Sequence, residues 1–117
     1  MIHFTTKDMV GYIVRMRDAD GKETFKFVET KIKKIVNGTT KISVYTDRFR
    51  VLDAEEIESN TQILHRGNNI MLVGEPFITS PDYSEHCRKT VDYWNEHGAE
   101  SILNSVLNPD SDKTNDL

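Results

Sequence analysis

The chain has little cysteine and no long apolar run, and these two absences exclude several classes of protein. Its 117 residues include one cysteine, Cys87, so no internal disulfide can form, and we expect a reducing, cytoplasmic location. The longest apolar run is residues 70–73, far shorter than the roughly 20 residues that span a bilayer. Charged residues interrupt the N-terminus, which does not resemble a secretory signal. We therefore expect no membrane partner.

Motifs for catalysis and cofactor binding are also missing. The glycine-containing stretches at 67–69 and 74–76 lack the Lys-Ser/Thr pair that completes a phosphate-binding loop. His86 and His97 lie about three helical turns apart, which is too far for them to share a metal ion. Cys87 lies on the apolar stripe of the same segment, where a buried thiol is expected. The sequence thus predicts a protein that is not an enzyme and holds no metal and no cofactor.

The charge of the chain is unevenly distributed. Residues 1–50 contain 11 Lys and Arg against 6 Asp and Glu, a balance of +5. Residues 51–117 contain 4 against 13, a balance of −9, and the two halves give the net charge of −4. Such asymmetry is typical of proteins that contact a polyanion, or in which one half complements the other electrostatically.

The composition predicts one folded domain, because apolar residues make up 37% of the chain and charged residues 29%. We expect this domain to span residues 1–108 and a disordered acidic tail to follow at 109–117. Alternating apolar and polar residues favour strands over the N-terminal two-thirds. The expected strands lie at residues 10–17, 24–30, 32–36, 40–46, 62–66 and 69–74. Helices are expected at 80–98 and 99–107, so the predicted fold is α+β. It is an antiparallel β-meander or small open barrel of about five to six strands, followed by one or two C-terminal helices.

Short local signals predict where some of these elements begin and end. Asn37 and Gly38 favour a tight type I′ hairpin turn, which requires positive φ at both central residues. Asp53 fits the cap of a short helical turn that ends near Glu56.

The C-terminal helix carries the clearest helical pattern. Ser80 fits its cap, Pro81 its first position and Gly98 its end. The residues at helical spacing that should form its buried stripe are Tyr83, Cys87, Val91 and Trp94. Trp94 alternatively fits an exposed anchor for a protein partner, but the stripe favours a core position. Tyr93 lies off the stripe and is the better candidate for an exposed aromatic.

A break in strand periodicity suggests a basic face. Apolar positions 42 and 44 are even and 49 and 51 are odd, so a shared core face requires a β-bulge or a sharp bend near Asp47. That break would place Lys41, Tyr45, Arg48 and Arg50 on one side. The full set of candidate anion-binding or nucleic-acid-binding residues is Arg15, Arg17, Lys31, Lys33, Lys41, Tyr45, Arg48 and Arg50. The alternative is an ordinary solvated strand face, in which lysines protect an edge strand.

The acidic half suggests a surface for a protein partner. Its candidate residues are Asp82, Glu85, Asp92, Tyr93, Glu96 and Glu100. We predict a small non-enzymatic binding or regulatory module that acts through this interface, as an adaptor or an inhibitor of the kind found in phages and mobile elements. Two alternatives remain: single-stranded nucleic-acid or nucleotide binding by the basic face, and a homo-oligomer in which basic and acidic halves of neighbouring copies meet.

Overall fold

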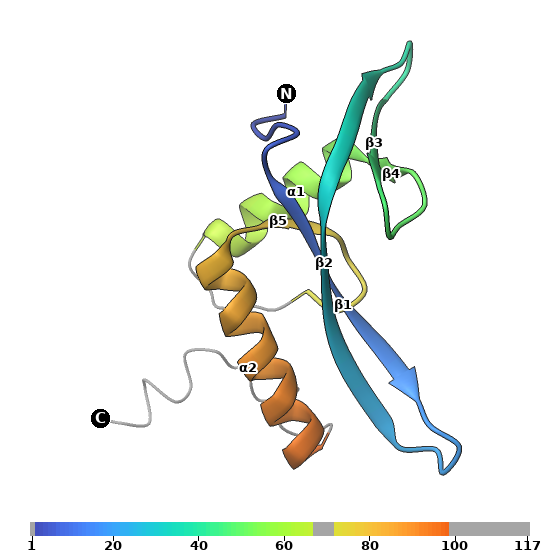
Figure 1. The fold of residues 1–117 in the computed structure, drawn as a ribbon, viewed down its shortest axis with the longest axis vertical. Coiled ribbons are helices and arrows are strands. Elements are labelled where there is room, and N and C mark those ends of the chain that lie inside the picture. The colour runs from blue at the N-terminus through green and yellow to red at the C-terminus, as the bar shows by residue number, and fades with distance from the viewer. Residues whose placement is uncertain (1, 67–71, 99–117) are drawn as a thin grey trace.

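The computed structural model of the chain describes residues 2–66 and 72–98, which form one antiparallel sheet and two helices (Figure 1). The elements are β1 (Met9–Arg17), β2 (Glu23–Asn37), β3 (Ile42–Thr46), β4 (Leu52–Asp53), α1 (Ala54–His65), β5 (Phe77–Thr79) and α2 (Pro81–His97). The strand order is β4-β3-β2-β1-β5, so β1 to β4 form a meander and β5 returns to pair with β1. The predicted α+β class, an antiparallel meander followed by a C-terminal helix, is confirmed.

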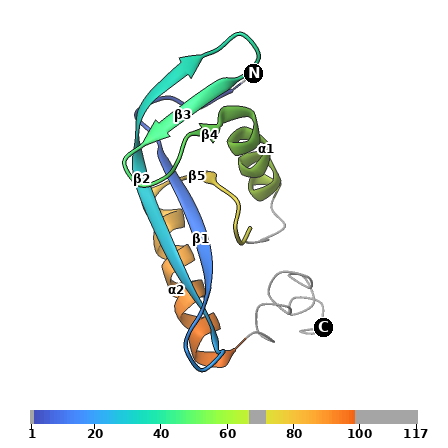
Figure 2. The same cartoon turned by 90° about the vertical axis from the view of Figure 1, so that its right-hand side faces the viewer.

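The two helices cover opposite faces of the sheet and lie at opposite ends of it (Figure 2). On the α2 side the core consists of Ile13, Phe25, Phe77, Cys87, Val91 and Trp94. On the α1 side it consists of Phe4, Val10, Ile32, Val44, Ala54 and Ile57. Each helix therefore covers one end of one sheet face.

Strand β2 differs from the prediction, because it is one strand of 15 residues rather than two. The register shifts between Ile32, which pairs with Thr46, and Lys34, which pairs with Tyr45. A β-bulge that was not predicted from the sequence thus lies on β2. Its effect is to place Ile32 and Ile35, three residues apart, in the same core cluster facing α1.

The break predicted near Asp47 is separate from this bulge. It is a bend over residues 47–50. After this bend Phe49 packs in the same cluster as Ile42 and Val44, whereas Val51 is exposed.

The turn between β2 and β3 forms the predicted hairpin but not the predicted type I′ turn. Four residues, 38–41, connect the strands, and Gly38 is not among the glycines with positive φ. The Gly38 N–H donates to the Lys41 carbonyl oxygen at 2.8 Å. A Cβ atom at Gly38 would lie 2.7 Å from that oxygen, so the position needs glycine for its close backbone approach.

Helix α1 replaces the short helical turn predicted at residues 53–56 and the strand predicted at residues 62–66. Asp53 is its cap as expected, accepting from the Glu55 N–H at 2.9 Å. The helix then continues to His65, through the predicted strand at 62–66, because Ala54, Ile57 and Thr61 follow helical spacing and are all buried.

The other expected C-terminal strand is only partly within the described chain. Residues 67–71 lie outside the described residues, and residues 72–74 contribute one isolated bridge, Ile13 to Val73, rather than a strand. The fifth strand is β5, which the sequence pattern did not predict.

Helix α2 follows the prediction closely. The Ser80 hydroxyl accepts from the Tyr83 N–H, Pro81 is the first helical residue, and Gly98 ends the helix with φ of 86°. The helices within residues 2–66 and 72–98 are α1 and α2. Neither of them is long and apolar enough to cross a membrane. The second helix predicted at 99–107 and the tail at 109–117 lie outside the described residues.

Polar side chains of both helices protect free strand edges. The Asn95 amide of α2 accepts from the Phe25 N–H at 2.7 Å and donates to the Phe25 carbonyl at 2.8 Å on β2. The Thr61 hydroxyl of α1 accepts from the Ile78 N–H of β5 at 2.9 Å. Glu29 of β2 also accepts from Ser84 and Arg88 of α2. All these contacts fix the helices on the sheet, and those to the backbone of Phe25 and Ile78 also block additional strand pairing there.

Candidate functional site

The outer face of α2 carries four acidic side chains in one line. Asp82, Glu85, Asp92 and Glu96 are all exposed, at helical spacing opposite the buried stripe, and we name this set the acidic stripe. Glu85 pairs with Lys89 of the same helix, Oε1 to Nζ 3.6 Å. Within the described chain, the other three have no ion-pair partner. The remaining acidic candidate, Glu100, lies outside the described residues.

Tyr93 lies beside the acidic stripe and is 51% exposed, as predicted. Its ring contacts the His97 imidazole, with 4.1 Å between ring centroids. The neighbouring Trp94 is fully buried and packs edge-to-face on Phe25 at 5.6 Å. The core interpretation of Trp94 is therefore confirmed, and Tyr93 is the aromatic side chain that α2 presents to solvent.

The predicted basic residues are spread over separate parts of the sheet. Arg15 and Arg17 lie at the end of β1 and both pair with Glu23, at 3.1 Å and 3.8 Å. Lys41 lies in the β2–β3 turn, whereas Arg48 and Arg50 lie in the loop after β3. Lys41 therefore lies before the start of β3 and the two arginines after its end. Anion binding by this set stays a prediction.

The bulge on β2 gathers a different basic set. Lys33 and Lys34 together oppose Tyr45, and both are exposed between the core residues Ile32 and Ile35. Lys31, one position before Ile32, is also exposed and faces the same side by strand alternation. The Lys34 Nζ lies 4.7 Å from the centroid of the Tyr45 ring.

We name Lys31, Lys33, Lys34 and Tyr45 the lysine face. Sequence reasoning did not include Lys34 among its candidates. The signal that marks it is the spacing of Ile32 and Ile35: two core residues three apart in a strand require a bulge between them.

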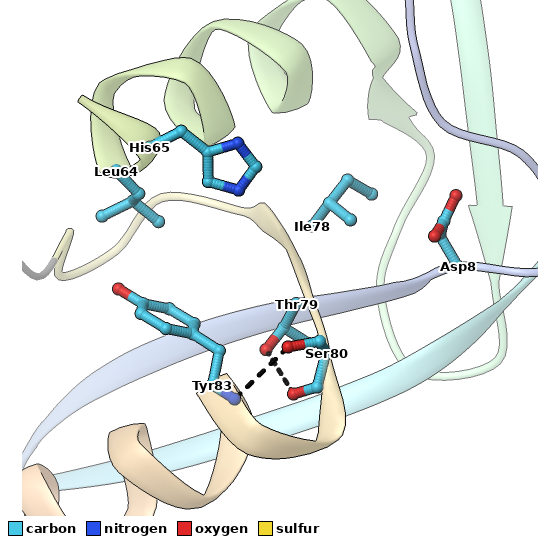
Figure 3. A pocket seen from close by; sticks show the side chains of 7 residues that line it. All are labelled: Asp8, Leu64, His65, Ile78, Thr79, Ser80 and Tyr83. Carbon is cyan, nitrogen blue, oxygen red and sulfur yellow. Dashed lines mark hydrogen bonds between the residues drawn. The ribbon is translucent and has the colours of Figure 1, made fainter. Parts of the chain in front are cut away.

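A hollow between α1 and the start of α2 is a further candidate that the sequence did not suggest (Figure 3). It has a volume of about 350 Å³ and is lined by Asp8, Leu64, His65, Ile78, Thr79, Ser80 and Tyr83. A neighbouring hollow of about 460 Å³ shares Asp8, His65 and Ile78 with it.

The polar groups of the hollow are mostly engaged in local structure. The Asp8 carboxylate accepts from the Thr5 N–H at 2.8 Å, and the Ser80 hydroxyl caps α2. Burial raises the pKa of the Tyr83 hydroxyl above its ordinary value. This arrangement has no side-chain base beside a nucleophile among the described residues, so it gives no support to catalysis.

Cys87 does not supply a nucleophile. Burial raises the pKa of its thiol to about 12, and the thiol is enclosed in the core under α2. Over residues 2–66 and 72–98 no three His, Cys, Asp or Glu side chains are arranged to hold a metal ion.

Glu58 of α1, which lines the neighbouring hollow, holds the N-terminal segment through His3. Its carboxylate accepts from the His3 backbone N–H at 2.6 Å and lies 3.2 Å from the His3 imidazole. Gln62 donates to the same carboxylate at 3.3 Å. Burial raises the pKa of Glu58, but these hydrogen bonds outweigh it and hold the pKa below its ordinary value of 4.5.

Replacing Glu58 by glutamine should therefore cost stability in a pH-dependent way. A carboxyl group whose pKa is lowered by folding stabilises the fold at pH values above its pKa in the unfolded chain. That contribution is lost as the pH falls through its pKa in the folded protein. We expect Glu58→Gln to lose about 1–2 kcal/mol at pH 7, with the difference from wild type shrinking at acid pH. Denaturant unfolding of wild type and variant at pH 7 and pH 3 measures this difference in the free energy of unfolding. Glu85→Gln, an exposed control, should show little change at either pH, and a pH-independent loss for Glu58→Gln would contradict the assignment.

Comparison of the chain with protein-family models, with curated proteins and with solved structures finds no match.

Proposed function

We propose that the protein is a small cytoplasmic binding module, an adaptor or inhibitor, that docks the outer face of α2 onto a basic surface of a protein partner. The observation that carries the proposal is the acidic stripe with Tyr93 beside it. Three of its carboxylates have no ion-pair partner in the described chain, so a cationic surface can pair with them without breaking an existing ion pair.

The two kinds of side chain have different roles in this proposal. Exposed carboxylates contribute little affinity each, but together they steer a basic partner and set its orientation. An exposed tyrosine supplies contact area and a hydroxyl, and tyrosine is enriched among residues that dominate binding energy. The rigid attachment of α2, through its buried stripe and the Asn95 contacts to Phe25, preorganises this surface.

Affinity capture with matched charge reversals tests the proposal. Immobilised wild type, Asp92→Lys/Glu96→Lys and Asp20→Lys/Glu56→Lys are exposed to lysate of the source cells, and retained proteins are identified after elution with rising salt. All four positions are exposed, and the control pair lies in the β1–β2 turn and on α1. We expect a protein that wild type and the control retain and the α2 variant loses by at least about tenfold, eluting as salt screens the charges. Equal retention by all three, or retention of nothing, would contradict the proposal.

A further inference from the structure

The lysine face lies on a part of the sheet that neither helix covers. Helix α1 packs on the opposite side, against Ile32 and Val44. Helix α2 contacts β2 first through Ser84 at Glu29 and then through Asn95 at Phe25, so it runs away from Lys31 as it proceeds. Figure 2 shows the same arrangement, with the upper sheet open on the side away from α1.

The charges on this face are largely uncompensated. Lys33 pairs with Asp47, Nζ to Oδ1 3.3 Å, but both side chains are well exposed and such a pair is weak. Lys31 and Lys34 have no carboxylate partner among the described residues. By contrast, Arg15 and Arg17 at the far end of the sheet share Glu23. The lysine face should therefore attract an anion more strongly than Arg15 and Arg17 do.

Tyr45 makes this face more specific than a simple basic patch. Its ring is half-buried on the open side of β3, and Lys34 lies against it. An aromatic ring with adjacent cations on an open sheet face can stack a base while the cations contact the flanking phosphates. The acidic side chains of a peptide pair with the cations but have no aromatic face to stack on the ring. A duplex hides its bases and is usually held by a strongly basic domain, whereas this chain has a pI near 5.5.

We propose that the lysine face binds single-stranded nucleic acid, with Tyr45 stacking a base and Lys31, Lys33 and Lys34 contacting phosphates. This is a second binding activity, carried by β2 and β3 rather than by α2. It does not depend on the proposed protein partner.

Fluorescence anisotropy with a labelled oligothymidylate of about twelve nucleotides, at about 20 mM salt, tests the proposal. Wild type should bind. Lys31→Glu/Lys34→Glu should weaken binding by at least about tenfold and reduce the salt slope by about 1.4, because each lost phosphate contact removes roughly 0.7. The control Lys22→Glu/Lys26→Glu changes the same charge on the β1–β2 hairpin and should stay within about twofold of wild type. Circular dichroism confirms that each variant folds.

Tyrosine variants separate stacking from charge. Tyr45→Phe keeps the ring and should bind like wild type, whereas Tyr45→Ser should bind about fivefold or more weakly. Asp92→Lys/Glu96→Lys should still bind the oligonucleotide, so failure of one proposal is distinguishable from failure of the other.

Three results would overturn the inference. They are absence of binding at low salt, equal weakening of binding by the two pairs of lysine substitutions, and full competition by polyglutamate with no effect of Tyr45→Ser.

Discussion

Trp94→Ala should lower the free energy of unfolding by about 3–5 kcal/mol, as is typical when a buried tryptophan is truncated. Trp94 is fully buried between α2 and the sheet, where it packs with Cys87 and Val91 and edge-to-face on Phe25. The aromatic pair adds about 0.5–1.5 kcal/mol beyond the area that it buries. A small domain has about 5–15 kcal/mol in total, so much of the stability would be lost. Urea unfolding followed by circular dichroism measures it.

The adjacent residue supplies the matched control. Tyr93→Ala removes an aromatic ring of similar size from the next position, but that ring is 51% exposed and contacts His97 rather than the core. We expect a change within about 0.5 kcal/mol. Similar losses for the two variants would mean that α2 does not present the face described above.

Ile57→Ala should lower the free energy of unfolding by about 2–5 kcal/mol, the usual cost of truncating a buried isoleucine. Ile57 is fully buried on α1 and belongs to the core cluster with Val10, Ile32 and Val44 on the other side of the sheet. The loss reflects both the removed apolar area and the cavity that remains. The same urea titration measures it.

Ser59→Ala is the control for Ile57. Ser59 lies two residues further along α1 and is exposed, and alanine is the better helix former, so we expect no loss beyond about 0.5 kcal/mol. A cost below about 1 kcal/mol for Ile57→Ala would indicate that residues 54–65 do not dock on the sheet as a helix.

The elements that could be predicted from the sequence are those whose signals are local and agree with one another. Helix α2 has a serine cap, a proline at its first position, an apolar stripe and a glycine at its end, and each is where the sequence indicated. The exposed Tyr93 and buried Trp94 follow directly from that stripe. The β2–β3 hairpin was predicted correctly, but its turn type depends on a close approach of Gly38 to the Lys41 carbonyl that no dipeptide rule contains.

The errors share one physical cause, which is that tertiary contacts decide between alternatives that local patterns leave open. Apolar residues near 62–66 fit a strand as well as a helix until Ala54, Ile57 and Thr61 are included in the same stripe. The bulge on β2 is absent from the prediction, because local alternation does not show that Ile32 and Ile35 share a face. Packing of Ile32 and Ile35 on the α1 side of the sheet requires this bulge, and it therefore decides which lysines lie beside Tyr45.

Site-specific photo-crosslinking tests the proposed interface of α2 most directly. p-Benzoylphenylalanine placed at Tyr93, or at the control position Met16, is activated in cells that produce the protein. Met16 is 41% exposed and lies near the end of β1. The account predicts a crosslinked protein species from position 93 that is absent from position 16 and is lost when Asp92 and Glu96 are changed to lysine. An equal crosslink from both positions, or none from position 93, would contradict it.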